Sequence, residues 1–317
     1  MSSHSISASN QASNVKMSES NSDQSWRCEY PFASNYMDIG SNRMHFVDQK
    51  PMEETGQDPV LMVHGNPTWS FYWRRLIDSL SQTRRTIAVD HIGCGLSDKP
   101  ADYQYCLQNH IDNLCKLVDE LDLKNVTLMA HDWGGAIGMG ALLARKDRFK
   151  KIVLFNTAAF PPPFIPFRIR VCRWPLVGKI GVQGFNLFAR AATFMTTERK
   201  GGLPKSIADG MLAPYDNWAN RVAIYNFVKD IPLSRNHRTW SVLEKIESGL
   251  QSVADWPILM MWGMKDWCFR PECLDRLTEH WPAAEVHKIA DAGHYVIEDA
   301  AEKVDQTVVE FLARHQS

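Results

Sequence analysis

Hydrophobic positions follow two alternating patterns along this chain. Nearly continuous apolar runs are typical of strands buried on both faces of a sheet, and they occur at Pro59–His64, Arg85–Asp90, Val126–Ala130, Phe149–Phe155 and Ile258–Trp262. Between and after these runs, apolar residues recur every three or four positions, which predicts helices at 71–80, 109–121, 134–144 and 271–281 and a last helix ending near residue 314. A strand at 285–289 and an opening hairpin at 36–47 complete the pattern. The alternation predicts an α/β fold with a mostly parallel, doubly wound sheet flanked by helices.

The stretch from Phe160 to Ser234 has a different character. It is rich in aromatic residues, shows helical spacing and contains no run typical of a strand. Because it lies between two predicted sheet strands, we interpret it as a helical cap over the strand ends, where open α/β sheets place their active sites. The predicted organisation is a tail at 1–24, a main domain at 25–159 and 235–317, and a cap at 160–234. A second, unrelated helical domain is the alternative to a cap.

Composition narrows the class of protein. Hydrophobic residues make up 44% of the chain and charged ones 22%, with a formal net charge of −1, so nothing global indicates nucleic acid or a membrane as a partner. The first 24 residues are rich in Ser, Asn and Gln and predict a disordered tail without the apolar segment of a secretory signal. The seven cysteines are scattered without a CxxC pair, which favours reduced thiols, a cytoplasmic location and no metal site.

The segment around Asp132 carries the main chemical signal. A predicted strand ends at Ala130, and a helix follows Trp133, so that Asp132 stands in the pattern small-x-nucleophile-x-small that Gly134 completes. This pattern is typical of the nucleophile elbow of α/β-hydrolases, in which a sharp turn exposes the nucleophile. A carboxylate is ionised at neutral pH and needs no activating base. Its attack on an sp³ carbon gives an ester, which predicts alkyl halides, epoxides or strained lactones as substrates. The alternative is that Asp132 only caps the helix.

Two residues further along the chain complete a predicted triad. His294 follows the last predicted strand, where this fold places its base, and would activate the water that attacks the Asp132 ester. Asp266 follows the strand before it and would orient His294. In some relatives the acid follows the preceding strand, but that position is Asn156, which cannot serve as an acid.

Asn66 and Trp133 are the predicted donors of the site. The loop after the strand at 59–64 and the residue after the nucleophile supply the two backbone N–H groups of the oxyanion hole in this fold. The side chains of Asn66 and Trp133 are also donors, and together they could hold a departing halide. This pair of donors favours an alkyl halide over an epoxide as the substrate.

The chain from about Trp26 onward resembles the haloalkane dehalogenases. The resemblance rests on five motifs: HGNPTW (64–69), HIGCGLSDKP (91–100), HDWGG (131–135), WGMKD (262–266) and DAGHY (291–295). It implies an α/β-hydrolase fold, a triad of Asp132, His294 and Asp266, a halide site at Asn66 and Trp133, and no cofactor or metal. It also implies a small apolar halogenated alkane as substrate, halide as a product, and compatibility with a homo-oligomer.

Three other functions stay open at this stage. The chain also resembles the β-lactone decarboxylases of bacterial olefin biosynthesis, whose site is similar throughout. Epoxide hydrolases share part of the motifs and need two cap tyrosines as donors, for which Tyr215 and Tyr225 are candidates. A non-catalytic binding protein is the alternative of another class. We therefore expect a haloalkane dehalogenase first, with the β-lactone decarboxylase or epoxide hydrolase as the alternative.

Overall fold

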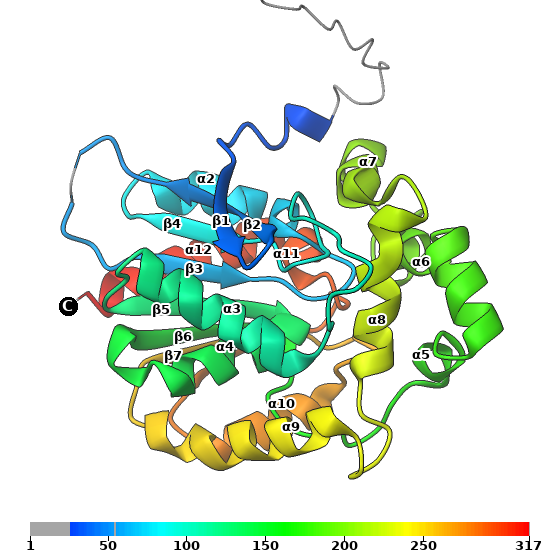
Figure 1. The fold of residues 1–317 in the computed structure, drawn as a ribbon. Coiled ribbons are helices and arrows are strands. Elements are labelled where there is room, and N and C mark those ends of the chain that lie inside the picture. Colours follow the sequence, from blue (N-terminus) through cyan, green and yellow to red (C-terminus); the bar gives the residue numbers. More distant parts are fainter. Residues whose placement is uncertain (1–25, 54, 317) are drawn as a thin grey trace, which may run out of the picture.

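The computed structural model describes residues 26–53 and 55–316 (Figure 1). The predicted tail at 1–24 lies outside the described residues. The strands are β1 (Asn35–Ile39), β2 (Asn42–Gln49), β3 (Val60–Val63), β4 (Thr86–Val89), β5 (Val126–Asp132), β6 (Phe149–Thr157), β7 (Ile258–Gly263) and β8 (Glu285–Ile289). The α-helices are α2 (Arg74–Ser81), α3 (Leu107–Glu120), α4 (Trp133–Ala144), α5 (Phe167–Val171), α6 (Leu187–Met195), α7 (Lys205–Leu212), α8 (Val222–Asp230), α9 (Arg238–Gly249), α10 (Pro271–His280), α11 (Val296–Asp299) and α12 (Ala301–Arg314).

The eight strands form one sheet in the order β1-β2-β4-β3-β5-β6-β7-β8. The pairings of β1 with β2 and of β2 with β4 are antiparallel, and all the others are parallel. Every residue of β3, β4 and β7 is buried, which explains why these strands read as continuous apolar runs. The predicted α/β fold with a mostly parallel, doubly wound sheet is confirmed.

Helices cover both faces of the sheet. Along β3, Leu61 and Val63 belong to a core shared with α3, α4, α9 and α10, whereas Val60 and Met62 belong to a core shared with α2, α11 and α12. This alternation follows from the two-residue period of a strand. The helix ends differ from prediction by a few residues, and a short 3-10 turn at Ser70–Trp73 precedes α2.

The predicted cap region contains helices only. Between residues 160 and 234 the chain forms α5 to α8, the π-helical turn η3 (Val177–Gly184), and the 3-10 turns η4 (Ala213–Tyr215) and η5 (Ala219–Arg221). Figure 1 shows these helices beyond the carboxyl ends of the parallel strands, where β5, β6 and β7 end at Asp132, Thr157 and Gly263. We refer to residues 160–234 as the cap. No helix in the described part of the chain is long and apolar enough to cross a membrane.

Candidate active site

Asp132 occupies a sharp turn between β5 and α4. Its backbone has a φ of 55° and a ψ of −131°, a conformation that L-residues rarely adopt. The turn brings α4 against β3 so closely that a Cβ atom at Gly134 would lie 2.2 Å from the carbonyl oxygen of Val63. Glycine at position 134 is therefore a steric requirement of the turn. The structure thus has the strained strand-to-helix turn that the sequence pattern predicts.

The three predicted triad side chains meet above the carboxyl ends of the strands. His294 lies between β8 and α11, with Nε2 3.6 Å from Oδ2 of Asp132. Its Nδ1 lies 2.7 Å from Oδ2 of Asp266, in the loop after β7. The other oxygen of Asp266 accepts hydrogen bonds from the backbone N–H groups of Cys268 (2.6 Å) and Phe269 (3.1 Å). These bonds fix the carboxylate, which in turn fixes the orientation of the imidazole.

Asn156, dismissed as an acid from the sequence, holds the predicted acid in place. Its Nδ2 donates to Oδ2 of Asp266 at 3.0 Å and to the carbonyl oxygen of Gly263 at 3.0 Å, and its Oδ1 accepts from the backbone N–H of Gly263. The side chain therefore links the ends of β6 and β7. A signal for this role was present, because an amide at the end of the strand next to the acid is placed to donate to it.

Two other buried histidines support the site through hydrogen bonds. His131 donates from Nε2 to the carbonyl oxygen of His294 at 2.9 Å, and burial holds the pKa of His131 well below its ordinary value. His64 accepts at Nε2 from the backbone N–H of His91 at 3.1 Å. Both rings are thereby engaged in hydrogen bonds, and neither residue lines the cavity.

Burial and the neighbouring charges shift the pKa values of Asp132 and His294. Burial raises the pKa of Asp132, although His294 and the N–H groups of Trp133 and Asn66 favour the ionised form. Burial alone would lower the pKa of His294, but Asp266 and Asp132 together raise it above its ordinary value. Alkylation of Asp132 would remove one of those two charges. The resulting ester would therefore lower the proton affinity of His294 at the stage where a base is needed.

The predicted donors surround the nucleophile. The backbone N–H of Asn66 donates to Oδ1 of Asp132 at 2.7 Å, and that of Trp133 also bonds the carboxylate. Donors to this carboxyl group would stabilise the oxyanion that forms if water attacked an Asp132 ester. The side-chain amide of Asn66 donates to the carbonyl oxygen of Ile224 in α8 at 3.2 Å. The buried Nε1 of Trp133 has no hydrogen-bond partner among the described residues.

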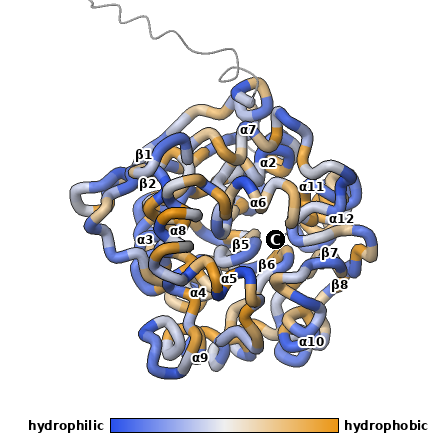
Figure 2. The backbone as a smooth tube through the Cα atoms, turned by 90° about the vertical axis from the view of Figure 1, so that its right-hand side faces the viewer, coloured by the Kyte–Doolittle hydropathy of each residue, from blue (hydrophilic) through white to orange (hydrophobic). Residues whose placement is uncertain are grey.

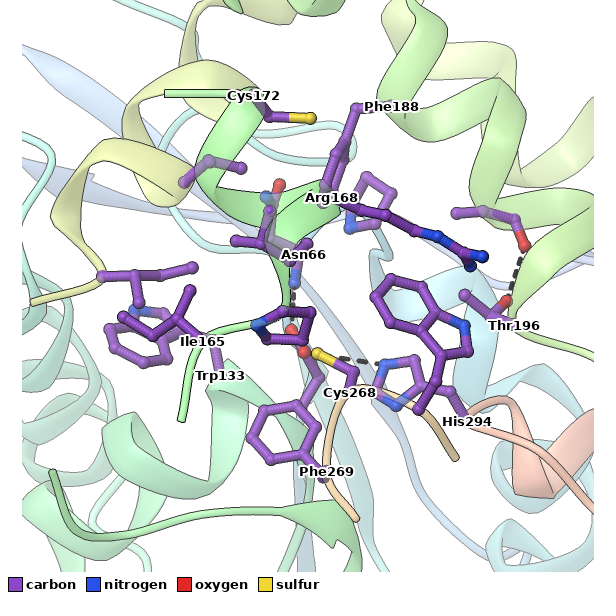
Figure 3. Close-up of a pocket in the computed structure, with 18 of the residues that line it drawn as sticks. Asn66, Trp133, Ile165, Arg168, Cys172, Phe188, Thr196, Cys268, Phe269 and His294 are labelled. Carbon is purple, nitrogen blue, oxygen red and sulfur yellow. Dashed lines mark hydrogen bonds and ion pairs between the residues drawn. The ribbon is translucent and has the colours of Figure 1, made fainter. Parts of the chain in front are cut away.

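A cavity of about 350 Å³ separates these groups from the cap. Asp132, His294, Asn66 and Trp133 form its floor, and Figure 3 shows Cys172 and Phe188 of the cap on the opposite side. The lining from the cap is almost entirely apolar, and it includes Phe164, Ile165, Ile169, Cys172, Val182 and Phe188. Such a cavity fits an apolar molecule with its reactive atoms directed at the floor.

The two tyrosines considered for an epoxide do not line the cavity. Tyr215 is buried, and its hydroxyl group donates to the carbonyl oxygen of Thr68 at 3.4 Å. Tyr225 lies against Gly178 of η3. Neither residue belongs to the cavity lining, so the structure lacks the donors that the epoxide mechanism requires at these positions.

Comparisons with known proteins agree with this geometry. A family model for the alpha/beta hydrolase fold matches residues 58–171 and 183–301. The chain is 40% identical over 294 residues to a cis-3-alkyl-4-alkyloxetan-2-one decarboxylase of Shewanella oneidensis, covering 90% of each protein. It is 32% identical to haloalkane dehalogenase 2 of Mycobacterium tuberculosis, covering 89% of this chain and 95% of that one.

The solved structures give the same result for the fold. The crystal structure of the haloalkane dehalogenase DatA from Agrobacterium tumefaciens C58 superposes with a TM-score of 0.79, at 25% identity, covering 89% of this chain and 96% of that one. The resemblance to haloalkane dehalogenases is therefore confirmed, and the identity to the oxetanone decarboxylase is higher. The chain belongs to the α/β hydrolase fold family, and its relatives within that family include both haloalkane dehalogenases and oxetanone decarboxylases.

Proposed function

We propose that this protein is a decarboxylase of cis-3,4-dialkyl oxetan-2-ones, which are β-lactones, and that it acts through the carboxylate of Asp132. The observation that carries the proposal is an aspartate at the nucleophile elbow, facing an almost wholly apolar cavity. The 40% identity to a protein named for this activity supports the choice of substrate. This choice reverses the order expected from the sequence, which placed the halogenated alkane first.

The first step is attack on the ring. An oxygen of Asp132 forms a bond to C4 of the lactone while the bond from C4 to the ring oxygen breaks. The ring oxygen becomes part of a free carboxylate attached to C3. Release of ring strain drives this step, and the N–H groups of Asn66 and Trp133 orient the attacking carboxylate. The indole N–H of Trp133, which has no partner among the described residues, can donate a hydrogen bond to the newly formed carboxylate.

The second step releases the products without water. The bond between C3 and the carboxylate breaks, its electrons form the C3–C4 double bond, and the bond from C4 to Asp132 breaks. The products are CO₂ and an alkene, and the Asp132 carboxylate is regenerated. An apolar cavity favours this step, because the carboxylate charge is poorly solvated there and disperses as CO₂ leaves.

The geometry of the two steps predicts the alkene isomer. Attack occurs with inversion at C4, and it leaves the new C–O bond antiperiplanar to the C3–carboxylate bond. Anti elimination then follows directly. Inversion followed by anti elimination converts a cis-disubstituted lactone into a cis alkene.

The test is an incubation with a cis-3,4-dialkyl oxetan-2-one, with alkene and CO₂ measured by gas chromatography. We expect equal amounts of the two products and retention of the cis geometry, with neither product formed by Asp132→Ala. A β-hydroxy acid in place of the alkene would contradict decarboxylation. A trans alkene would contradict the inversion–elimination sequence.

A second candidate function is hydrolysis of haloalkanes. The observation that favours it is the pair of side-chain donors at Asn66 and Trp133, of which the indole N–H has no partner among the described residues. In this reaction halide departs as Asp132 attacks, and His294 then activates water against the ester. Bromide release from bromoalkanes, without alkene formation from the lactone, would favour this function over the first.

His294→Ala separates the two reactions within one protein. On a bromoalkane the variant should stop after one turnover and accumulate an alkyl ester, visible as a mass increase on the peptide that contains Asp132. On the lactone, the ester carries the carboxylate that expels Asp132, so turnover should continue. A variant that stops on both substrates would indicate that the lactone opens at its carbonyl group instead of at C4.

A further inference from the structure

Large apolar side chains are concentrated on the outside of the cap. Outside the cap, the described chain leaves only Tyr36, Met52 and Val309 exposed to a comparable degree. Within the cap, nine such side chains are between 47% and 75% exposed. Leu233 stands at the end of the cap, and the other eight form what we call the cap patch: Phe167, Trp174, Leu176, Ile180, Phe185, Leu187, Phe194 and Trp218. A monomer that stays in water rarely leaves so many large apolar side chains exposed together.

These side chains belong to neighbouring elements. A methyl group at Gly184 of η3 would lie 3.4 Å from the Trp218 ring, and one at Gly181 would lie 3.5 Å from Leu187. Trp218 and Leu187 therefore flank η3, which itself carries Ile180. Figure 2 looks directly onto this side of the molecule, where α5 and α6 lie in front of the strand ends. Ile180, Leu187 and Trp218 are therefore neighbours, and the other five members of the patch lie in α5, in α6 or in the connections of η3 to them.

The same region carries a strong positive charge. Residues 160–200 contain one acidic side chain, Glu198, and the seven basic ones Arg168, Arg170, Arg173, Lys179, Arg190, Arg199 and Lys200, for a formal charge of +6. The rest of the chain therefore has a formal charge of −7, so the overall value of −1 conceals two opposed regions. Arg170, Lys179 and Arg190 are exposed, and none of them forms an ion pair within the described residues.

The cap patch is continuous with the cavity. Leu187 is 56% exposed and also lines the cavity, as do the exposed Arg168 and Met195. The Arg168 guanidinium lies 5.4 Å from the ring of Trp267, another residue of the lining. An apolar molecule that entered beside Leu187 and Met195 would therefore reach the cavity directly from the surface of the patch.

We propose that the cap patch docks this protein onto the surface of an anionic lipid membrane. The aromatic and aliphatic side chains would lie at the level of the headgroups, and the exposed arginine and lysine side chains would contact lipid phosphates. A second copy of this chain fits the patch less well, because a symmetric contact would bring two regions of charge +6 together. The inference revises the expectation of no membrane partner, which rested on the overall charge.

This docking goes beyond the proposed reaction and does not depend on it. The test is sedimentation of the full chain with vesicles of phosphatidylglycerol and phosphatidylcholine, compared with vesicles of phosphatidylcholine alone. We expect at least tenfold stronger binding to the anionic vesicles, decreasing as salt shortens the screening length. The Asp132→Ala variant should bind equally well, so that a failure of the proposed reaction and a failure of docking are distinguished.

Two sets of substitutions test the basic side chains beside the patch and the apolar side chains within it. Arg170→Glu combined with Lys179→Glu and Arg190→Glu should lower binding to the anionic vesicles by about 100-fold or more. Ile180→Ser with Phe185→Ser should lower it by about tenfold, since both side chains are exposed and would insert. The control with the same charge change is Lys150→Glu, Lys245→Glu and Lys303→Glu, at exposed positions outside the cap, which should leave binding within about threefold.

Three outcomes would overturn the proposal. One is absence of sedimentation with anionic vesicles, and another is equal binding to both kinds of vesicle. The third is equal loss of binding in the cap and control charge variants, because the effect would then follow net charge alone. If vesicles are not bound and Ile180→Ser with Phe185→Ser converts a dimer to a monomer in sedimentation velocity, the patch belongs to a contact between copies instead. Thermal melting of each variant verifies that it is folded.

Discussion

The floor and the roof of the cavity are built in opposite ways. On the floor, the Asp266 carboxylate alone is bonded by Cys268, Phe269, Asn156 and His294. The roof consists of side chains such as Phe188 and Ile169 of the cap, whose contacts are apolar and carry little direction. A network of directed bonds fixes atoms to within tenths of an ångström, whereas apolar packing tolerates changes of shape.

This difference bears on the fact that the chain is similar to relatives with two different named activities. Under the proposed mechanism, the floor determines which bond is attacked, because it presents a carboxylate, its donors and a base in one arrangement. The roof would then determine which molecule is held above that carboxylate. We therefore expect variants of the floor to affect every substrate, and variants of the roof to affect the choice among substrates.

The largest expected effect is that of Asp132→Ala. Removal of the nucleophile should lower turnover of both the lactone and a bromoalkane by at least about 10⁴-fold. The measurement is product formation at saturating substrate. The matched control is Cys268→Ala, which changes another side chain of the lining but keeps the backbone N–H that bonds Asp266, and should stay within about tenfold. Equal losses in both variants would contradict the assignment of the nucleophile.

Trp133→Phe should have the next largest effect. The substitution keeps an aromatic ring but removes the buried indole N–H, which has no other partner among the described residues. Loss of one donor to a developing anion lowers rates by about 10²- to 10³-fold. Single-turnover kinetics with either substrate measure the effect on Asp132 attack. A loss that appears only in product release would show that the donor does not act on the transition state.

As the pH is lowered, kcat/KM should begin to fall at a higher pH than the pKa of an ordinary aspartate would give. Asp132 must be ionised to attack, and burial raises its pKa. The ionised fraction therefore begins to fall at a higher pH than for an ordinary aspartate, whose pKa is about 4. We expect kcat/KM for the lactone to fall about tenfold per pH unit below that limb. A profile that stays flat down to the ordinary range of aspartate would be inconsistent with a buried nucleophile.

Phe188→Ala, in the roof, should have the smallest effect on the rate but should clearly change the preference among substrates of different chain length. Enlarging an apolar pocket changes discrimination between chain lengths by about 10- to 100-fold. We expect longer alkyl chains to gain relative to shorter ones, with maximal turnover within about tenfold of the unmodified protein. Competition between two lactones of different chain length measures the ratio. If activity on short-chain and long-chain lactones falls equally, Phe188 affects the reaction itself and not the choice among substrates.

The main features of the fold were predictable because they depend on local patterns. Strands β3 to β7 were found from their apolar runs, since burial on both faces leaves a continuous signal, and β1 and β2 were found from the hairpin. The positions of Asp132, Asp266 and His294 were likewise predictable, because each follows a recognisable strand, and the structure brings all three together.

The rest depends on contacts between distant residues. Asn156 was missed as a support because it was considered only as an acid, and the pairing of β6 with β7 that brings it to Asp266 is fixed by the fold and not by a local pattern. In the cap, helical spacing predicted helices but could not separate Phe188, which lines the cavity, from Phe185, which is 66% exposed. The order of the candidate substrates could not be predicted for a related reason. An aspartate nucleophile fixes the bond that forms and leaves open the molecule that supplies the carbon.

The close approach at Gly134 has a consequence for how such a protein can change over evolutionary time. In a saturation library scored by folded yield, position 134 should accept glycine alone, because any Cβ meets the backbone of Val63. Position 132 should accept a few short polar residues that tolerate its backbone angles and can take the hydrogen bond from the N–H of Asn66. The backbone of the turn would therefore be retained while the side chain at position 132 changes. A single codon change at that position could then give the site a different chemical group.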